Sequence, residues 1–180
     1  YNVLLEKVGI DSVMATSIEM NHAWNLVNID GAWYHVDVTW DDPVPDTIGK
    51  VNHKYFMLSD KAIMSTTENR QYTHYNWESK GITAESEKYD NEFWSGVSTE
   101  FFMQDGKWYF VSDDGVYSTY VEATGEVNSY VSIDDEKWMV WGDSKSYWSG
   151  KYASLIISEG TVYYNTPQMI YSMNLDGSNK

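Results

Sequence analysis

The segment 22–39 constrains the fold more than any other part of this sequence, because it has the pattern of a β-hairpin. Two stretches of alternating apolar residues, 23–29 and 32–39, flank the dipeptide Asp30-Gly31. This dipeptide favours a two-residue type I′ turn, in which both turn residues need a positive φ. The segment therefore predicts two antiparallel strands whose register is set by the turn.

That register places a histidine and a carboxylate on the same face of the hairpin. His22 is opposite Thr39 and Trp24 is opposite Asp37, and residues two apart in a strand share a face. His22 and Asp37 are then diagonal neighbours, and we expect their side chains to meet. A carboxylate next to an imidazole fixes one tautomer and stabilises the imidazolium, as general-base catalysis requires. From the spacing alone, His22 and Asp37 are candidate catalytic residues, and the alternative is an ordinary surface hairpin with an incidental histidine and aspartate.

The opposite face of the hairpin has the composition of a core layer. The register assigns to it the side chains of Ala23, Val27, Ile29, Tyr34, Val36 and Val38. The first face instead carries His22, Trp24, Asn28, His35, Asp37 and Thr39. We therefore expect the apolar face to pack into the interior and the other face to hold the site.

The hairpin and its flanking segments resemble bacterial transglutaminase-like proteins, a family in the papain-like cysteine protease superfamily. The resemblance covers about residues 1–75 and rests on three stretches: the helical YNVLLEKVGIDS, the hairpin HAWNLVNIDGAWYHVDVTWDDP, and NHKYFMLSD. It implies a Cys-His-Asp mechanism that acts on peptide or glutamine amide bonds and needs no cofactor.

The resemblance also assigns roles to individual residues. His22 would be the catalytic base and Asp37 the acid that orients it, while the walls of the substrate site would be Trp24 and Trp40. The family's nucleophile is a cysteine at the start of the helix that ends here near Val8, but this sequence contains no cysteine. We therefore expect the chain to lack the cysteine-bearing part of the domain and to be inactive alone.

The charge of the chain restricts its partners. The formal net charge is −15 at pH 7, with only 12 lysines and arginines, whereas nucleic acids and anionic membranes are bound through basic side chains. We expect neither as a partner, and basic partners or neutral glycans fit the charge better. The resemblance implies a peptide or protein substrate, with cell-wall or glycan components as further candidates. No apolar stretch is long enough to span a bilayer. The acidic composition, rich in Ser, Thr, Asn and Tyr, is typical of bacterial surface proteins, so the expected location is extracellular or the cell surface.

Outside the hairpin, the sequence predicts short helices and further strands. The expected elements are a helix over 1–8 closed by Gly9, strands over 11–18 and 55–58, and a short helix that Ser59 caps and that runs to Met64. The segment 79–92 is rich in charged and small residues, which indicates a domain boundary near residue 90. We expect a transglutaminase-like domain over 1–90 and a β-rich module over 91–180.

The second half of the sequence contains an internal repeat of aromatic strands. The stretch that begins at Asp105-Gly106 aligns with the stretch that begins at Glu159-Gly160, and the same offset brings Val121 over Leu175. Hairpins with a period in the fifties resemble the blades of some bacterial β-propellers, although two repeats cannot close a propeller of about four or more blades. The predicted fold class is α+β and mainly antiparallel β, with a partial transglutaminase-like sheet followed by propeller-like hairpins.

His35 offers an alternative partner for Asp37. It lies on the same face two residues away, but a structural histidine that is hydrogen-bonded within the sheet explains it better. His35 and Asp37 with His53 or His74 also fit a two-histidine, one-carboxylate iron site. The jelly-roll strands expected with such a site do not precede it, so we predict no metal here.

Two further clusters are candidates for ligand binding. The first is acidic and comprises Asp37, Asp41, Asp42 and Asp46. It lacks the alternate spacing of an EF-hand calcium loop, which favours a solvated loop. The second is aromatic, could stack on sugars, and comprises Trp138, Trp141, Tyr147 and Trp148. The alternative function is therefore an extracellular glycan- or protein-binding module on a catalytically dead transglutaminase-like scaffold.

Overall fold

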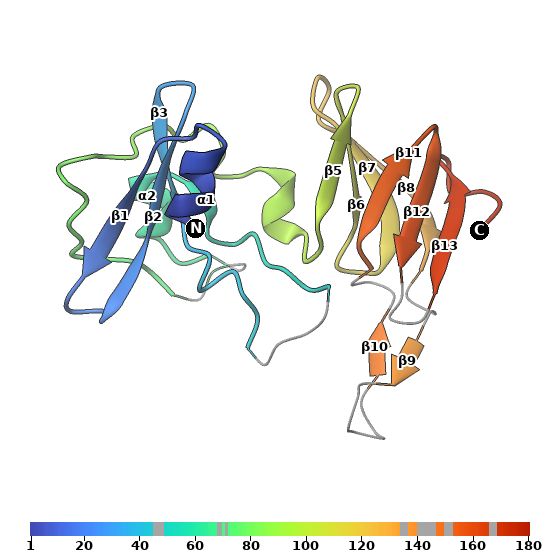
Figure 1. Ribbon diagram of the computed structural model, residues 1–180, viewed down its shortest axis with the longest axis horizontal. Coiled ribbons are helices and arrows are strands. Elements are labelled where there is room, and N and C mark those ends of the chain that lie inside the picture. Colours follow the sequence, from blue (N-terminus) through green and yellow to red (C-terminus); the bar gives the residue numbers. More distant parts are fainter. Residues whose placement is uncertain are drawn as a thin grey trace. The chain divides into compact units, whose positions relative to one another are not determined.

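The computed structural model describes residues 1–44, 49–67, 70, 72–133, 137–139, 147–149, 153–165 and 169–180. For 137–139 and 147–149 it describes the backbone only. The chain divides into two compact units, each built on antiparallel strands (Figure 1). Unit 1 comprises Tyr1–Asp42 and Asn52–Ser95, and unit 2 comprises Pro43–Val51 and Gly96–Lys180. The predicted predominance of antiparallel β structure is confirmed. Among the described residues, no helix has the length and apolar character needed to cross a membrane.

Unit 1 is organised around a four-stranded sheet in the order β1-β2-β3-β4. Each strand pairs with the next one along the chain, so the connections are local. The elements are α1 (Asn2–Lys7), β1 (Ser12–Ser17), β2 (His22–Ile29), β3 (Ala32–Val36), β4 (Phe56–Leu58) and α2 (Asp60–Ile63). The predicted helices and strands of this region are therefore present, with ends that differ by a few residues.

The turn between β2 and β3 has the predicted conformation. Asp30 has φ 53° and Gly31 has φ 85°, as the two central residues of a type I′ turn require. Asn25 pairs with Val36, and Ile29 pairs with Ala32. The predicted register of the hairpin is confirmed, and with it the assignment of side chains to its two faces.

The prediction that the opposite face of the hairpin is the packed one is only partly right, because both faces are covered. On that face Val27, Tyr34 and Val36 are buried, but Ala23 and Val38 are exposed. On the site face, Trp24 and Leu26 belong to a core cluster with side chains from β1, β4, α2 and the loop that follows: Ala15, Leu58, Ala62, Ile63 and Ala84. Segments that come later in the chain therefore cover the site face.

Helix α2 begins at a side-chain cap, as predicted. The hydroxyl oxygen of Ser59 accepts a hydrogen bond from the backbone N–H of Ala62 at 3.0 Å. The carboxylate of Asp90 accepts from both the backbone N–H and the hydroxyl of Ser59, each at 2.7 Å. The cap fixes where the helix starts and hence where Asp60, its first residue, projects.

The described residues of unit 2 form two larger sheets and one small one. Their orders are β5-β6-β7-β8, β11-β12-β13 and β10-β9. The elements are η1 (Phe93–Gly96), which begins in unit 1, β5 (Phe101–Gln104), β6 (Lys107–Val111), β7 (Val116–Val121), β8 (Glu126–Ser132), β9 (Lys137–Met139), β10 (Tyr147–Ser149), β11 (Leu155–Ser158), β12 (Thr161–Asn165) and β13 (Ile170–Asn174). One core cluster draws side chains from both larger sheets, among them Val111, Tyr117, Leu155 and Val162.

The internal repeat is visible in the pairing of the strands. The β5–β6 turn lies at Asp105-Gly106 and the β11–β12 turn at Glu159-Gly160. All four residues have a positive φ, between 49° and 75°. The third strands differ by one residue, because Lys107 pairs with Val121 whereas its equivalent Thr161 pairs with Asn174 instead of Leu175. The three strands of each repeat therefore start at the constant offset predicted from the sequence, and only the pairing of the third strand is shifted by one residue.

Candidate functional site

Asp37 follows directly after β3 and is held by the backbone around it. Its own N–H donates to the carbonyl oxygen of Tyr55 at 3.0 Å. Its Oδ1 accepts from the N–H groups of Thr39 at 3.1 Å and Trp40 at 3.2 Å. Next to it, the β3–β4 register shifts and Met57 has φ 60°, which marks a β-bulge. Asp37 is fully buried, so its orientation is fixed by the fold.

The side chains of His22 and Asp37 meet, as the register of the hairpin predicted. Nε2 of His22 lies 2.6 Å from Oδ2 of Asp37. A second histidine, His74, reaches the same oxygen with its own Nε2 at 2.7 Å. His74 comes from a loop beyond α2 and is fully buried. The structure therefore adds a residue that the sequence suggested only within the iron-site alternative.

The imidazole of His22 lies against two indole rings. It stacks on Trp24 with a centroid distance of 5.7 Å and an interplanar angle of 20°, and on Trp40 with 4.9 Å and 13°. Trp24 is only 2% exposed, whereas Trp40 is half-buried. Of the two tryptophans predicted to wall a substrate site, Trp40 therefore has the accessible surface, and Trp24 supports the imidazole from within.

His35 is bound at both ring nitrogens and does not compete for Asp37. Its Nδ1 accepts from the indole N–H of Trp24 at 2.8 Å, so its proton is on Nε2. That Nε2–H donates to Oδ1 of Asp60 at 2.7 Å. The prediction of a structural histidine is confirmed by these contacts. The hydrogen bond from His35, with a further backbone contact, holds the pKa of Asp60 below its usual value.

Burial and hydrogen bonding act in opposite directions at the centre of the site. Burial tends to raise the pKa of Asp37, but hydrogen bonds from His74, His22 and the N–H of Trp40 outweigh it and hold the pKa below the usual value. Burial lowers the pKa of His74, and the hydrogen bond to Asp37 only partly opposes it. At neutral pH the site therefore contains an aspartate anion and a neutral His74.

A neighbouring carboxyl group has the opposite shift. Burial raises the pKa of Asp41 to about 7, and the charge of Asp37 adds to the effect. The carboxylate of Asp41 accepts from the N–H of Tyr55 at 2.9 Å. Of the other members of the predicted acidic cluster, Asp42 is exposed and Asp46 lies outside the described residues. Asp37 and Asp41 both accept from backbone N–H groups, as the groups of a structural loop do.

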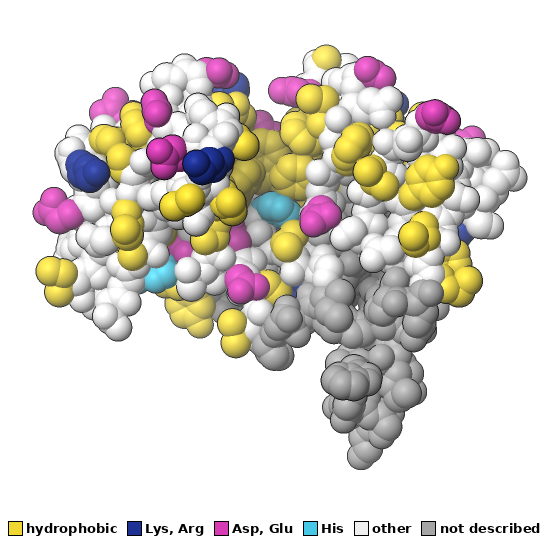
Figure 2. Space-filling view, viewed as in Figure 1, with side chains coloured by type: hydrophobic (Ala, Val, Ile, Leu, Met, Phe, Trp, Pro, Cys, Tyr) yellow, Lys and Arg dark blue, Asp and Glu magenta, His cyan; other side chains and the backbone are white. Residues whose placement is uncertain are grey.

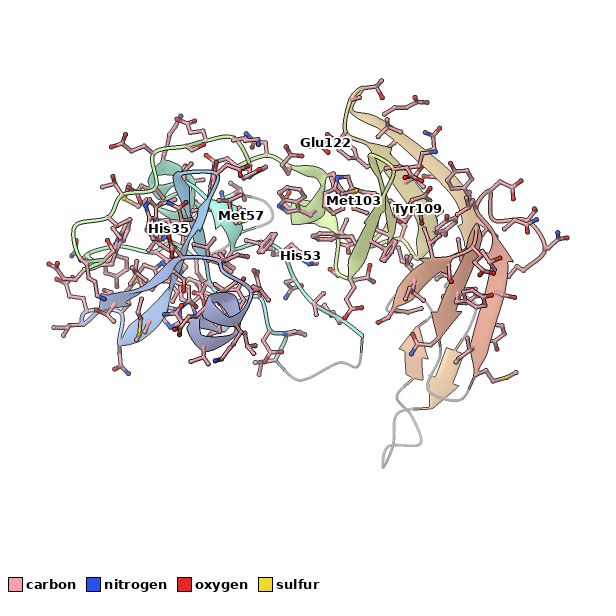
Figure 3. The ribbon with its side chains drawn as sticks, turned by 45° about the horizontal axis from the view of Figure 1, so that its top comes forward. His35, His53, Met57, Met103, Tyr109 and Glu122 are labelled. Atoms are coloured by element: carbon pink, nitrogen blue, oxygen red, sulfur yellow. The ribbon has the colours of Figure 1, made fainter. Side chains whose placement is uncertain are left out.

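Among the described residues, one group has metal-ligand character. The potential ligand atoms of His22, Asp37 and His74 lie within 4.8 Å of one another. This group differs from the iron-site alternative, because both ring nitrogens of His35 are bound elsewhere and His53 is not a member of the group. Figure 3 shows His53 well apart from His35, on the segment that leads to β4. Both Nε2 atoms approach one oxygen at hydrogen-bond distance, which is the geometry of two N–H donors on a carboxylate.

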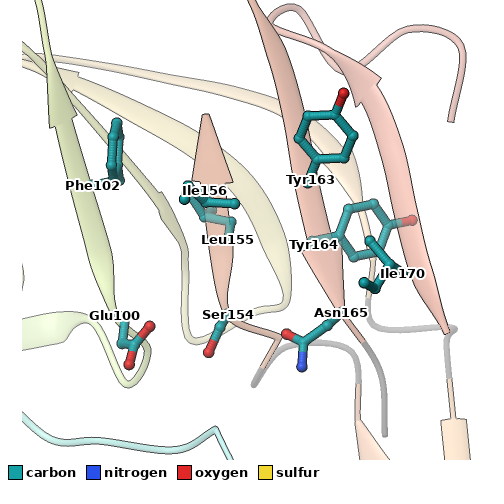
Figure 4. A pocket seen from close by; sticks show the side chains of 9 residues that line it. All are labelled: Glu100, Phe102, Ser154, Leu155, Ile156, Tyr163, Tyr164, Asn165 and Ile170. Atoms are coloured by element: carbon teal, nitrogen blue, oxygen red, sulfur yellow. The ribbon is translucent and has the colours of Figure 1, made fainter. Parts of the chain in front are cut away.

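Unit 2 contains a groove of about 640 Å³ beside its two larger sheets (Figure 4). Aromatic and aliphatic side chains line it, and a carboxylate, an amide and a hydroxyl group lie at one end: Phe102, Leu155, Ile156, Tyr163, Tyr164, Ile170, Glu100, Asn165 and Ser154. The predicted aromatic cluster falls on β9 and β10, of which only the backbone is described: Trp138, Tyr147 and Trp148. Its fourth member, Trp141, lies outside the described residues.

The surface agrees with the acidic composition. On the face shown in Figure 2, acidic side chains are spread over both units, and lysines and arginines are few. No family model matches the sequence, and no curated protein or solved structure matches the chain.

Proposed function

We propose that unit 1 is part of a transglutaminase-like cysteine enzyme that acts on peptide or glutamine amide bonds. The observation that supports this most strongly is the 2.6 Å contact between Nε2 of His22 and Oδ2 of Asp37. An ionised carboxylate only accepts hydrogen bonds, so the proton of a neutral His22 lies on Nε2. Nδ1, on the other edge of the ring, is then the basic atom.

This tautomer suits a base that activates a thiol. In the complete site, Nδ1 of His22 would take the proton of a cysteine, and the thiolate would attack the amide carbonyl. The Nδ1–H would then protonate the departing amine, and water or a second amine would release the acyl group. Asp37 stabilises the imidazolium throughout, and proton transfer of this kind contributes about 10²–10⁴-fold to the rate. The sequence contains no cysteine, so the proposed reaction needs a thiol from outside these 180 residues.

The aromatic surroundings give the two tryptophans different roles. Trp24 is buried between His22 and His35, and so keeps the imidazole in place. Trp40 also stacks on His22 but remains partly accessible, so it would contact the acyl part of a peptide or protein substrate. Such a substrate, and the acidic Ser/Thr/Asn/Tyr-rich composition, favour an extracellular or cell-surface location.

A thiol-reactive activity probe tests this proposal on the full-length product of the parent reading frame. The expected result is labelling of one cysteine upstream of Tyr1 that is lost in the variant His22→Ala and retained in His53→Gln. The second variant changes a histidine of unit 1 outside the site. A product with no such cysteine, or labelling that is indifferent to His22, would contradict the enzyme.

The groove of unit 2 supports a second candidate function, a glycan-binding module with propeller-like hairpins. Tyr163 is 40% exposed and offers a ring for stacking, and the groups of Glu100 and Asn165 are suited to sugar hydroxyls. NMR titration of the chain with cellotetraose and chitotetraose tests it. Shifts confined to the groove and abolished by Tyr163→Ala would support binding, and a spectrum unchanged at millimolar sugar would contradict it.

A further inference from the structure

The carboxylate of Asp37 has an unusually complete set of donors. Oδ1 accepts from the N–H groups of Thr39 and Trp40, and Oδ2 accepts from His22 and His74. An ionised carboxylate offers about four lone-pair positions, so these four contacts fill it. A protonated Asp37 would place an O–H among four donors. The surroundings therefore favour the anion, and His74 supplies one of its four donors.

His74 has only one proton arrangement that fits its surroundings. Its Nε2 must carry a proton, because the atom it faces is a carboxylate oxygen at 2.7 Å. Its Nδ1 is buried and has no hydrogen-bond partner among the described residues. A second proton there would create a buried cation with an unpaired N–H, which is costly. The ring is also enclosed by aromatic neighbours, with centroids 4.3 Å from Trp40 and 4.5 Å from Trp24.

We propose that His74 is a positioning residue for the His22–Asp37 pair, acting as a permanently neutral donor that keeps Asp37 ionised and in the orientation that His22 needs. His22, at 13% side-chain exposure, is the imidazole with access to solvent, whereas His74 has none. The two histidines on one oxygen thus have different tasks. The link to catalysis rests on the proposed function, but the hydrogen-bond role does not.

A metal-binding role for the same three residues is less well supported. A ligand histidine usually donates its second ring N–H to a carboxylate, a carbonyl or water. Nδ1 of His74 finds no such partner among the described residues, and both Nε2 atoms are at hydrogen-bond distance from Oδ2. Binding of zinc by these residues is therefore the alternative that the experiment below also tests.

Two variants of matched size separate donation from packing. His74→Gln keeps an N–H donor near the position of Nε2, and His74→Met fills a similar volume without a donor. In each, the titration of the Asp37 carboxyl is followed by ¹³C NMR in the 180-residue chain. Removing a donor to the anion raises the pKa, so we expect the midpoint to rise by about one pH unit in His74→Met and to remain close to wild type in His74→Gln. His53→Gln is the control and should leave it unchanged.

Among the described residues, four other titratable groups interact with Asp37, so the titration of its carboxyl can be interpreted group by group. They are His22 on β2, His74, and on the neighbouring loops Asp41 and Tyr55. The ring ¹⁵N shifts of the four histidines are recorded in the same samples. If His74→Met does not fold, the wild-type spectrum alone decides: a protonated Nε2 and a bare Nδ1 in His74 are expected.

Three results would overturn the proposal. They are an Asp37 midpoint that is the same in folded His74→Met and in wild type, a wild-type His74 protonated on Nδ1, and saturable binding of Zn²⁺ that shifts His22 and His74 together. These measurements use no thiol, so they are independent of the thiol-probe result. In an active full-length enzyme, His74→Met should lower kcat more than His74→Gln does, with little change in KM.

Discussion

Two histidine–carboxylate contacts lie on the same face of the sheet of unit 1, with nearly the same length and different consequences. Nε2 of His35 is 2.7 Å from Asp60, and Nε2 of His22 is 2.6 Å from Asp37. In the first pair, Nδ1 also accepts from Trp24, so both ring nitrogens are occupied. In the second pair, Nδ1 of His22 has no hydrogen-bond partner among the described residues, as the proposed base requires. The second ring nitrogen, more than the ion pair itself, separates a structural histidine from a candidate base.

The two pairs are also connected. Asp60 holds His35, His35 holds the indole N–H of Trp24, and Trp24 stacks on His22. The His35–Asp60 pair, called the structural pair below, thus supports one side of the His22–Asp37 pair, called the reactive pair after its proposed role. Changes to the reactive pair should affect chemistry, and changes to the structural pair should affect stability.

The largest expected effect is that of Asp37→Asn on the reactive pair. An amide accepts only on its oxygen, so its N–H₂ group must face either the two backbone N–H groups or the two histidines, and His22 is held less firmly. Thiol reactivity of the full-length enzyme should fall by about 10³–10⁴-fold, as for other orienting carboxylates. Labelling rates measure it, with the exposed Asp42→Asn as the control. A loss of less than about tenfold would show that Asp37 does not orient the base.

The structural pair is tested by Trp24→Phe. Phenylalanine retains an aromatic ring but leaves Nδ1 of the fully buried His35 without its donor. The free energy of unfolding should fall by about 1–3 kcal/mol, measured by urea denaturation at pH 7. Trp33→Phe, on the same hairpin and half-buried, should cost less. Equal losses in the two variants would show that the Trp24–His35 hydrogen bond contributes nothing specific.

Asp41 allows the electrostatics around the reactive pair to be tested by pH. Its pKa in the folded state is about 7, above the unfolded value near 3.9, so the folded state keeps a proton that the unfolded state loses. This contribution to stability is present below about pH 4 and is lost as pH rises to about 7. The free energy of unfolding of Asp41→Asn should therefore exceed that of wild type by about 2 kcal/mol at pH 8 and by much less at pH 4.5. Urea denaturation at both values measures the gain. A difference that does not depend on pH would contradict the shifted pKa, and Asp42→Asn is the matched control.

The smallest effect is expected from Ser59→Ala, which acts on the structural pair through helix α2. The cap at Ala62 is lost, and Asp90 loses one of its two contacts. The unfolding free energy should fall by about 1 kcal/mol. Ser65→Ala, at the other end of the same helix, removes an exposed contact and should cost less. Thermal melts of the two variants compare the contributions of the two helix ends to stability. A larger loss of stability in Ser65→Ala than in Ser59→Ala would contradict the role of the cap.

Much of unit 1 could be predicted because a local turn determines it. Asp30-Gly31 fixes the register, and the register places His22 beside Asp37 without further information. The cap at Ser59 is local in the same way. These features depend on residues a few positions apart along the chain.

The features that the sequence did not reveal depend on long-range packing. His74 lies in a loop without periodicity and reaches Asp37 only when the chain folds back over the sheet. The cover of the site face by Ile63 and Ala84 has the same origin. In unit 2, Asn174 pairs with Thr161 instead of Leu175, and this register cannot be read from a constant sequence offset between the repeats.

The central claim is that Asp37 holds the proton of neutral His22 on Nε2 and leaves Nδ1 bare. Ring ¹⁵N NMR of the 180-residue chain tests this directly, at a pH where His22 is neutral. The predicted result is a protonated Nε2 and an unprotonated Nδ1 for His22, with the distinction lost in Asp37→Asn. A proton on Nδ1, or a His22 spectrum that Asp37→Asn leaves unchanged, would contradict the account.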